Sequence, residues 1–147
     1  MKVLIEKIDE GIEEAIIRTR KMTPDIRKAV ALLEHNTKQI VAKFRGEKIF
    51  VNQQEILYFE SVNEKVFAYT RASEMQTEYT LNELEGMLGQ DGFFRCSKAF
   101  IVNLDKIVSL RSEMGNRIDA KLENGEHLII SRRYAKELRA ILKEGRP

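Results

Sequence analysis

Two adjacent arginines near the carboxyl terminus, Arg132 and Arg133, are the residues best suited to bind an anion. They follow Ser131, a common N-cap residue, and precede an apolar periodic segment, so both are expected in the first turn of a helix. The macrodipole and open N–H groups of a first turn attract anions, and arginine binds phosphate through two parallel hydrogen bonds. The pattern therefore indicates a phosphate site, with pairing of both arginines to nearby acids as the alternative.

A second polar and basic segment, residues 93–100, contains Arg95, Cys96, Ser97 and Lys98 between aromatic residues. The aromatics are expected to anchor the segment to the core, and a solvated loop without further function is the alternative. The positive charge of Arg95 and Lys98 lowers the pKa of a neighbouring thiol when that thiol is exposed. Cys96 is thus either a redox-sensitive residue of a binding loop or a small residue packed in the core.

The chain lacks the residues that catalysis or metal binding would need. The chain has two histidines, His35 and His127, and one cysteine, so it offers neither a Cys/His zinc set nor a nucleophile beside an evident base. It also has no glycine-rich phosphate loop and no helical carboxylate pair at metal spacing. We therefore expect no enzyme, no metal site and no cofactor.

Composition describes an ordinary soluble domain. The 147 residues are 43% hydrophobic and 33% charged, with a net charge of +2. Positive charge gathers in residues 91–147, which hold twelve Lys or Arg against eight Asp or Glu. No stretch approaches the ~18 apolar residues of a membrane span, and the first apolar run ends at Glu6, too short for a signal peptide. We expect a cytoplasmic protein with no stable membrane insertion.

The elements that must position these residues are mostly strands. Short β-branched and aromatic runs predict eleven strands, at 2–8, 15–19, 39–45, 48–51, 56–61, 65–70, 75–79, 100–102, 107–110, 117–122 and 127–130. Asn124-Gly125 predicts a type I′ hairpin between the last two, and Gly46 and Asn63-Glu64 predict two further tight turns.

Three helices interrupt the strands. Thr23-Pro24-Asp25 predicts a helix that ends near His35-Asn36. Thr80 and Glu83 form a capping box for a helix that stops at Gly89, and a third helix runs from Ser131 almost to Gly145. The fold class is therefore mostly β with short helices, α+β overall. Residues 1–38 form a strand, strand, helix extension, and residues 39–147 form the main domain.

Six segments fall in an order and spacing typical of one family: ILYFES (56–61), KVFAYT (65–70), the leucine-rich helix 81–88, FRCSKAFIVNL (94–104), Asn124-Gly125 and ISRRY (130–134). They resemble the LytTR DNA-binding domain of bacterial transcription regulators, over roughly residues 39–143. The resemblance implies an elongated arrangement of small antiparallel sheets that binds DNA through loops at the sheet ends, which enter successive major grooves.

The resemblance places DNA contacts on three groups of residues: Asn63, Glu64 and Lys65; Cys96, Ser97 and Lys98; and Arg132 and Arg133. Where many members have a His, then a basic or amide residue, then Ser, this chain has Ser97-Lys98-Ala99. We assign Arg133 to a base edge and Arg132, Lys98 and Lys65 to phosphates. Asn63 is assigned to a base or a phosphate.

The expected partners follow from the same resemblance. Family members usually carry a receiver of domain size, which 38 residues cannot hold, so the resemblance implies a stand-alone regulator. Its extension is then a dimerisation element, its target is double-stranded DNA with repeated promoter half-sites, and a separate protein partner supplies the signal. The alternative is a β-rich module that binds a protein or a small ligand, which salt-sensitive DNA binding would exclude.

Overall fold

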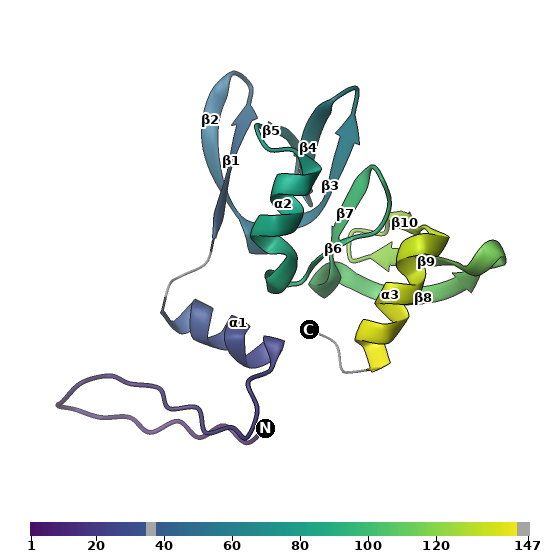
Figure 1. The fold of residues 1–147 in the computed structure, drawn as a ribbon. Helices are drawn as coiled ribbons and strands as arrows, with labels where there is room; N and C mark the ends of the chain where they lie inside the picture. Colours follow the sequence, from purple (N-terminus) through teal and green to yellow (C-terminus); the bar gives the residue numbers. More distant parts are fainter. Residues whose placement is uncertain (35–37, 144–147) are drawn as a thin grey trace.

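The computed structural model describes residues 1–34 and 38–143. Within them, ten strands form two antiparallel sheets that are accompanied by three α-helices (Figure 1), so the predicted β-rich fold class is confirmed. The strands are β1 Gln39–Phe44, β2 Glu47–Asn52, β3 Ile56–Val62, β4 Lys65–Thr70, β5 Glu74–Thr77, β6 Phe93–Arg95, β7 Phe100–Asn103, β8 Ile107–Glu113, β9 Arg117–Leu122 and β10 His127–Ile130. Among these residues, no helix has the length and apolar character needed to cross a membrane.

The larger sheet has seven strands in the order β2-β1-β5-β4-β3-β7-β6, and the smaller has three in the order β10-β9-β8. The buried side chains form two clusters. The first cluster joins the larger sheet to helix α2 (Leu81–Leu88), and the second joins the smaller sheet and helix α3 (Arg132–Lys143) to β3, β6 and β7. The larger sheet therefore contributes side chains to both cores.

Strand β3 contributes to both cores because its alternation is broken by a bulge. Ile56 and Phe59 belong to the first core, whereas Leu57 and Tyr58 belong to the second. The register with β4 shifts between Ile56 and Tyr58, and such an extra residue turns the following side chains to the other face. Among the phenylalanines of β3, β4, β6 and β7, three are buried, Phe59, Phe93 and Phe94, and two are half-buried, Phe67 and Phe100.

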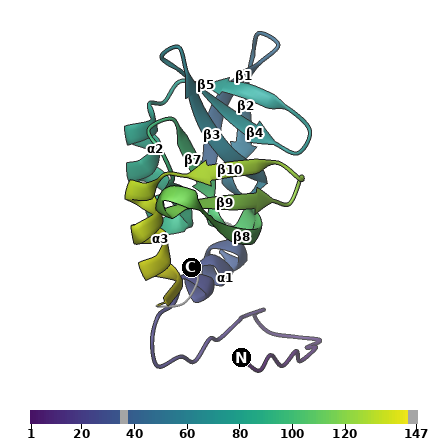
Figure 2. The ribbon, with the colours of Figure 1, turned by 90° about the vertical axis from the view of Figure 1, so that its right-hand side faces the viewer.

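The three predicted helices are present. Helix α1 (Pro24–Leu33) begins at Thr23, whose hydroxyl accepts from the Ile26 amide, and α2 begins at the predicted capping box of Thr80 and Glu83. Helix α3 places Ala135 and Leu138 in the second core. The expected ends near His35-Asn36 and Gly145 lie outside the described residues. Figure 2 shows α2 and α3 one above the other along one side of the molecule.

Turn geometry confirms two of the predicted tight turns and corrects the third. Arg45-Gly46 and Asn63-Glu64 are two-residue hairpin loops with positive φ at both residues, as in a type I′ turn. The β9–β10 hairpin is present but has a three-residue loop. Its Leu122 amide donates to the Glu126 carbonyl at 2.8 Å, and only Gly125 has a positive φ, so the predicted type I′ turn was wrong.

The strand predictions need two corrections, one near the N-terminus and one at β6. The strands expected at 2–8 and 15–19 do not form, because a strand needs a partner for its N–H and C=O groups and no strand among the described residues pairs with either segment. Conversely, β6 was not predicted. It has three residues and buries Phe93 in one core and Phe94 in the other, so it shows no alternation of apolar and polar residues.

Candidate nucleic-acid interface

The β3–β4 turn carries the first predicted contact group. Asn63 and Glu64 form the turn itself, with φ of +50° and +67°, and Lys65 is the first residue of β4. All three are exposed. The turn projects from the end of the sheet (Figure 1), so its side chains are free to meet a ligand while β3 and β4 fix their position.

The β6–β7 loop carries the second group and is held by Arg95. Arg95 Nε donates to the Ser97 carbonyl at 2.8 Å, and its Nη2 donates to the Lys98 carbonyl at 2.7 Å. Its Nη1 reaches Asn82 and Glu85 on α2, at 3.1 and 3.2 Å. One side chain that is 14% exposed thus joins the loop to a helix. Arg95 fixes the backbone that presents the Lys98 side chain.

Ser97 and Lys98 have different surroundings in this loop. The Ser97 hydroxyl accepts a hydrogen bond from the Ala99 amide at 3.2 Å, so it already stabilises the turn. Lys98 is exposed, and within the described residues its ammonium group has no ion pair with an acid. Lys98 is therefore the residue of this loop with a free positive charge.

Cys96 is not on the surface, which corrects its place among the predicted DNA contacts. Its side chain is completely buried in the second core, and its Sγ lies 3.5 Å from the Phe100 carbonyl oxygen. Burial raises the pKa of the thiol to about 12, although Arg95 acts in the opposite direction. Of the two alternatives for Cys96, the structure therefore shows the packed core residue and not an exposed loop thiol.

The first turn of α3 carries the third group. Arg132 and Arg133 are both exposed, and the Arg133 guanidinium lies 5.3 Å from the centre of the Tyr134 ring. Tyr134 in turn meets Phe94 edge-on, at 6.5 Å between ring centres. In the part of the chain that the structure describes, neither arginine forms an ion pair, so their pairing with nearby acids is not observed.

Two backbone hydrogen bonds join the three groups. The Ser61 amide at the end of β3 donates to the Ala99 carbonyl at 2.8 Å, and the Ser131 amide before α3 donates to the Cys96 carbonyl at 2.9 Å. The β6–β7 loop therefore lies between the β3–β4 hairpin and the start of α3, and all three lie along one side of the molecule (Figure 1).

A shallow groove brings part of the predicted set together. Glu64, Lys65 and Lys98 line it, together with Arg95 and Asn82. Arg132 and Arg133 do not line this groove and lie beyond the β6–β7 loop. Arg95 was missed as a site residue, although a cation within a run of buried aromatic residues is a sequence signal for a charge with a structural role. Among the described residues, no cluster of His, Cys, Asp or Glu is suited to a metal ion.

The model of the LytTr DNA-binding domain matches residues 46–143, which include all three groups. The chain belongs to this family. A solved LytTr DNA-binding domain from Bacillus cereus superposes with a TM-score of 0.68 at 27% sequence identity, covering 71% of this chain and 96% of that domain. The family match identifies a LytTR DNA-binding domain and not an enzyme.

Relatives of this LytTR chain carry regulatory names. Sensory transduction protein LytT of Bacillus cereus is 26% identical over 140 residues, which cover 89% of this chain and 57% of LytT. Transcriptional regulatory protein YpdB of Escherichia coli K12 is 27% identical over 125 residues, covering 84% of this chain and 50% of YpdB. The chain spans about half the length of the curated relatives it matches.

Proposed function

We propose that this LytTR chain is a sequence-specific regulator of transcription that reads double-stranded DNA with the three loop groups described above. The proposal rests on two backbone hydrogen bonds that join these groups on one side of a LytTR fold. The groups carry four exposed cations without an acidic partner among the described residues: Lys65, Lys98, Arg132 and Arg133. Such an array suits a polyanion with repeating phosphates.

We assign a different role to each contact. Arg133 faces a base edge in the major groove, because its guanidinium is supported by Tyr134 and an arginine fork matches the two acceptors of guanine. Arg132, Lys98 and Lys65 bind phosphates, and Asn63 binds a base or a phosphate. Glu64, an acid in the same turn, repels phosphate and limits affinity there.

The experiment is DNA binding by the full chain across a salt series, with a promoter duplex and an unrelated duplex. We expect Arg133→Ala to lose ~1–3 kcal/mol of preference for the promoter. Lys98→Ala is expected to weaken binding to both duplexes and to lower the log–log salt slope by about 0.9. Arg27→Ala, an exposed change on α1, is the control and is expected to bind as wild type does. Equal, weak binding of all proteins to both duplexes would favour the protein- or ligand-binding alternative.

We further propose that two copies act together on repeated half-sites, with residues 1–38 as the dimerisation element. Support comes from the extension's exposed apolar residues and from the length of DNA that one small domain can read. The relatives named above are bacterial proteins, and bacterial DNA lies in the cytoplasm, so we place the activity there. We also propose that a protein partner supplies the signal.

A further inference from the structure

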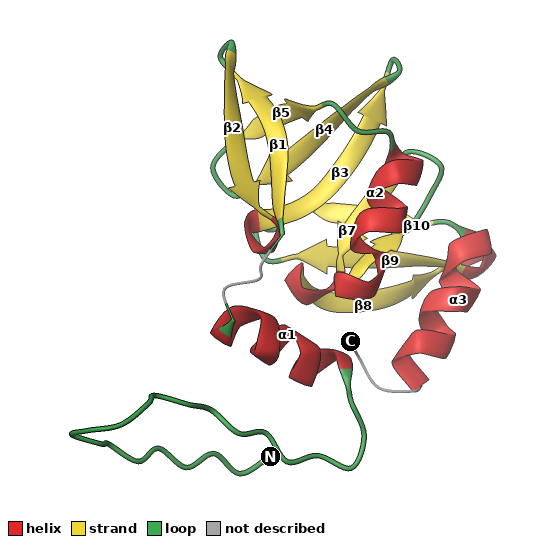
Figure 3. Cartoon of the chain, turned by 60° about the vertical axis from the view of Figure 1, so that its left-hand side comes forward, coloured by secondary structure: helices red, strands yellow, loops and turns green. Residues whose placement is uncertain are grey.

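Residues 1–22, here called the arm, carry large apolar side chains that are exposed. They form neither helix nor strand and extend away from α1 and the two sheets (Figures 1 and 3). Ile5 is 89% exposed, Ile12 87% and Ile16 70%. Large aliphatic side chains that no part of the protein covers mark a surface for association.

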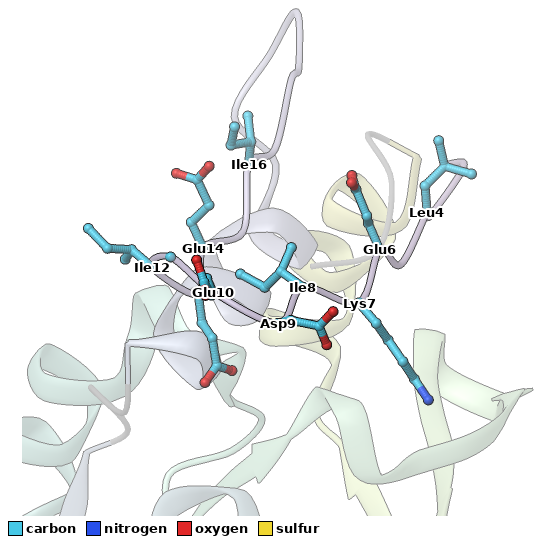
Figure 4. A pocket seen from close by; sticks show the side chains of 11 residues that line it. Leu4, Glu6, Lys7, Ile8, Asp9, Glu10, Ile12, Glu14 and Ile16 are labelled. Carbon is cyan, nitrogen blue, oxygen red and sulfur yellow. The ribbon is translucent and has the colours of Figure 1, made fainter.

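The arm does not bury these side chains within itself. Its two halves border an open hollow of about 870 Å³ that is lined by arm residues alone, from Leu4 to Ile16 (Figure 4). The side chains of Ile8, Ile12 and Ile16 stand apart from one another in this view. Even a hydrogen-bonded pair of strands has little stability in water without a further surface to pack on, and the arm lacks that pairing.

The sequence of the arm favours extended backbone, and its hydrogen-bonding groups need a partner. Residues 12–20 contain three isoleucines and a threonine, which are typical of strands. Thr19 and Lys21 hydrogen-bond to each other within the arm, and among the described residues no strand of either sheet pairs with this segment. A strand from another molecule would supply the missing partners.

The distribution of charge along the arm indicates which partner would pair with it. Residues 9–14 carry four acids, and residues 18–21 carry three bases. Two copies that align antiparallel bring the acidic half of each arm opposite the basic half of the other, whereas parallel alignment brings like charges together. A second copy of this chain therefore fits the arm without any further component.

We propose that residues 12–20 of two copies pair as antiparallel strands about a two-fold axis at Ile16. Each Glu14 then lies opposite an Arg18, and the two Ile16 side chains meet at the axis. This inference specifies the surface of the proposed homodimer and does not depend on the DNA contacts.

Charge reversal in the full chain tests the pairing. Glu14→Arg and Arg18→Glu each place like charges opposite one another, so each variant alone is expected to raise the dimer dissociation constant about tenfold in sedimentation velocity. A mixture of the two variants restores both opposite-charge pairs and is expected to return to wild-type affinity. Glu55→Arg, an exposed reversal outside the arm, is the control and should leave association unchanged.

A cysteine at the axis tests the register. Cys96 is buried and its thiol has a raised pKa, so it gives little background reaction. Under oxidised glutathione, Ile16→Cys is expected to cross-link into dimers, because antiparallel neighbours at a two-fold axis lie within disulfide reach. Met114→Cys, at a site 85% exposed outside the arm, is the control and should remain monomeric on denaturing gels.

Two results would overturn the pairing. One is a wild-type chain that stays monomeric at tens of micromolar, and the other is a dimer that neither charge reversal weakens. Promoter binding by the same preparations separates this inference from the proposed function. If Arg133-dependent DNA binding persists while the arms do not pair, the arm inference is wrong and the DNA-binding proposal stands.

Discussion

Arg95 positions the β6–β7 loop, whose Lys98 we propose as a DNA contact. Its four hydrogen bonds reach the Ser97 and Lys98 carbonyls on one side and Asn82 and Glu85 of α2 on the other. Lysine cannot replace this pattern, because its single ammonium group lacks the planar arrangement of donors that arginine has. The loop that carries Lys98 therefore depends on one guanidinium group.

Arg95→Ala is expected to lower the free energy of unfolding by about 1–3 kcal/mol, since charged hydrogen bonds at a partly buried site are lost. It should weaken DNA binding without lowering the salt slope, because we assign no phosphate contact to Arg95. Urea denaturation and the salt series measure the two effects. Lys98→Ala is the matched comparison, since it should lower the slope and leave stability nearly unchanged. A reduced slope in Arg95→Ala would show that Arg95 contacts DNA directly.

Cys96 is expected to resist thiol reagents in the folded protein. Its thiol is buried and its pKa is about 12, so the reactive thiolate is scarce at neutral pH. Mass spectrometry after iodoacetamide treatment should show slow modification of the native chain and rapid modification in denaturant. Rapid native labelling, or DNA binding that responds to mild oxidants, would contradict a packed Cys96.

At the scale of single elements, the β3–β4 turn combines a favourable and an unfavourable residue. Positive φ is well tolerated by Asn63, whereas Glu64 has a Cβ that disfavours its φ of +67°. The second position of a type I′ turn also needs a positive φ, which glycine adopts without a steric penalty. Asn-Gly is therefore the sequence that type I′ hairpins prefer. Glu64 therefore costs the hairpin stability, and it also adds negative charge to the interface.

Glu64→Gly is expected to stabilise the chain by about 1 kcal/mol, because the strain at positive φ is removed. It should also strengthen DNA binding, since an acid is lost from the groove. Glu64→Gln separates the two effects: it removes the charge, retains the Cβ, and should improve binding without raising stability. Thermal unfolding and DNA titration are the measurements. A less stable Glu64→Gly protein would show that the Glu64 side chain supports the turn.

At the scale of the whole molecule, the two cores are expected to unfold together. Both cores include residues of β3, β6 and β7. The side-chain amide of Asn103 on β7 donates to the Ile56 carbonyl on β3 at 2.9 Å. The Tyr58 hydroxyl also donates to Glu126 at 3.0 Å, which links the larger sheet to the β9–β10 loop. Disruption of one core therefore removes support from the other.

Leu84→Ala in the first core and Leu138→Ala in the second are each expected to cost about 2–5 kcal/mol, because both side chains are fully buried. Each variant should lower the midpoint of one common transition, seen alike by far-ultraviolet circular dichroism and by tyrosine fluorescence in urea. Ile129→Ala, at a half-exposed position of β10, is the control with a small effect. Two separate transitions in either core variant would mean that the sheets unfold independently.

The sequence by itself determined the elements whose signals are local. Alternating runs predicted nine of the ten strands in the described residues, and Thr23, Thr80 and Glu83 predicted where two helices begin. Local chemistry decides such features, because a cap or a tight turn involves residues close in the chain. The cations proposed to contact DNA were also evident, since charge requires no knowledge of distant neighbours.

Only the tertiary structure decided which apolar residues are buried and which loops meet. The segments predicted as strands at 2–8 and 15–19 have no partner strand among the described residues, whereas β6, with three residues, is a strand because β7 lies beside it. Arg95 and Cys96 are neighbours in sequence, yet the Cys96 side chain is buried in the core and the Arg95 side chain joins the β6–β7 loop to α2 by hydrogen bonds. Burial and hydrogen-bond partners depend on residues far away in the sequence, so local patterns do not contain them.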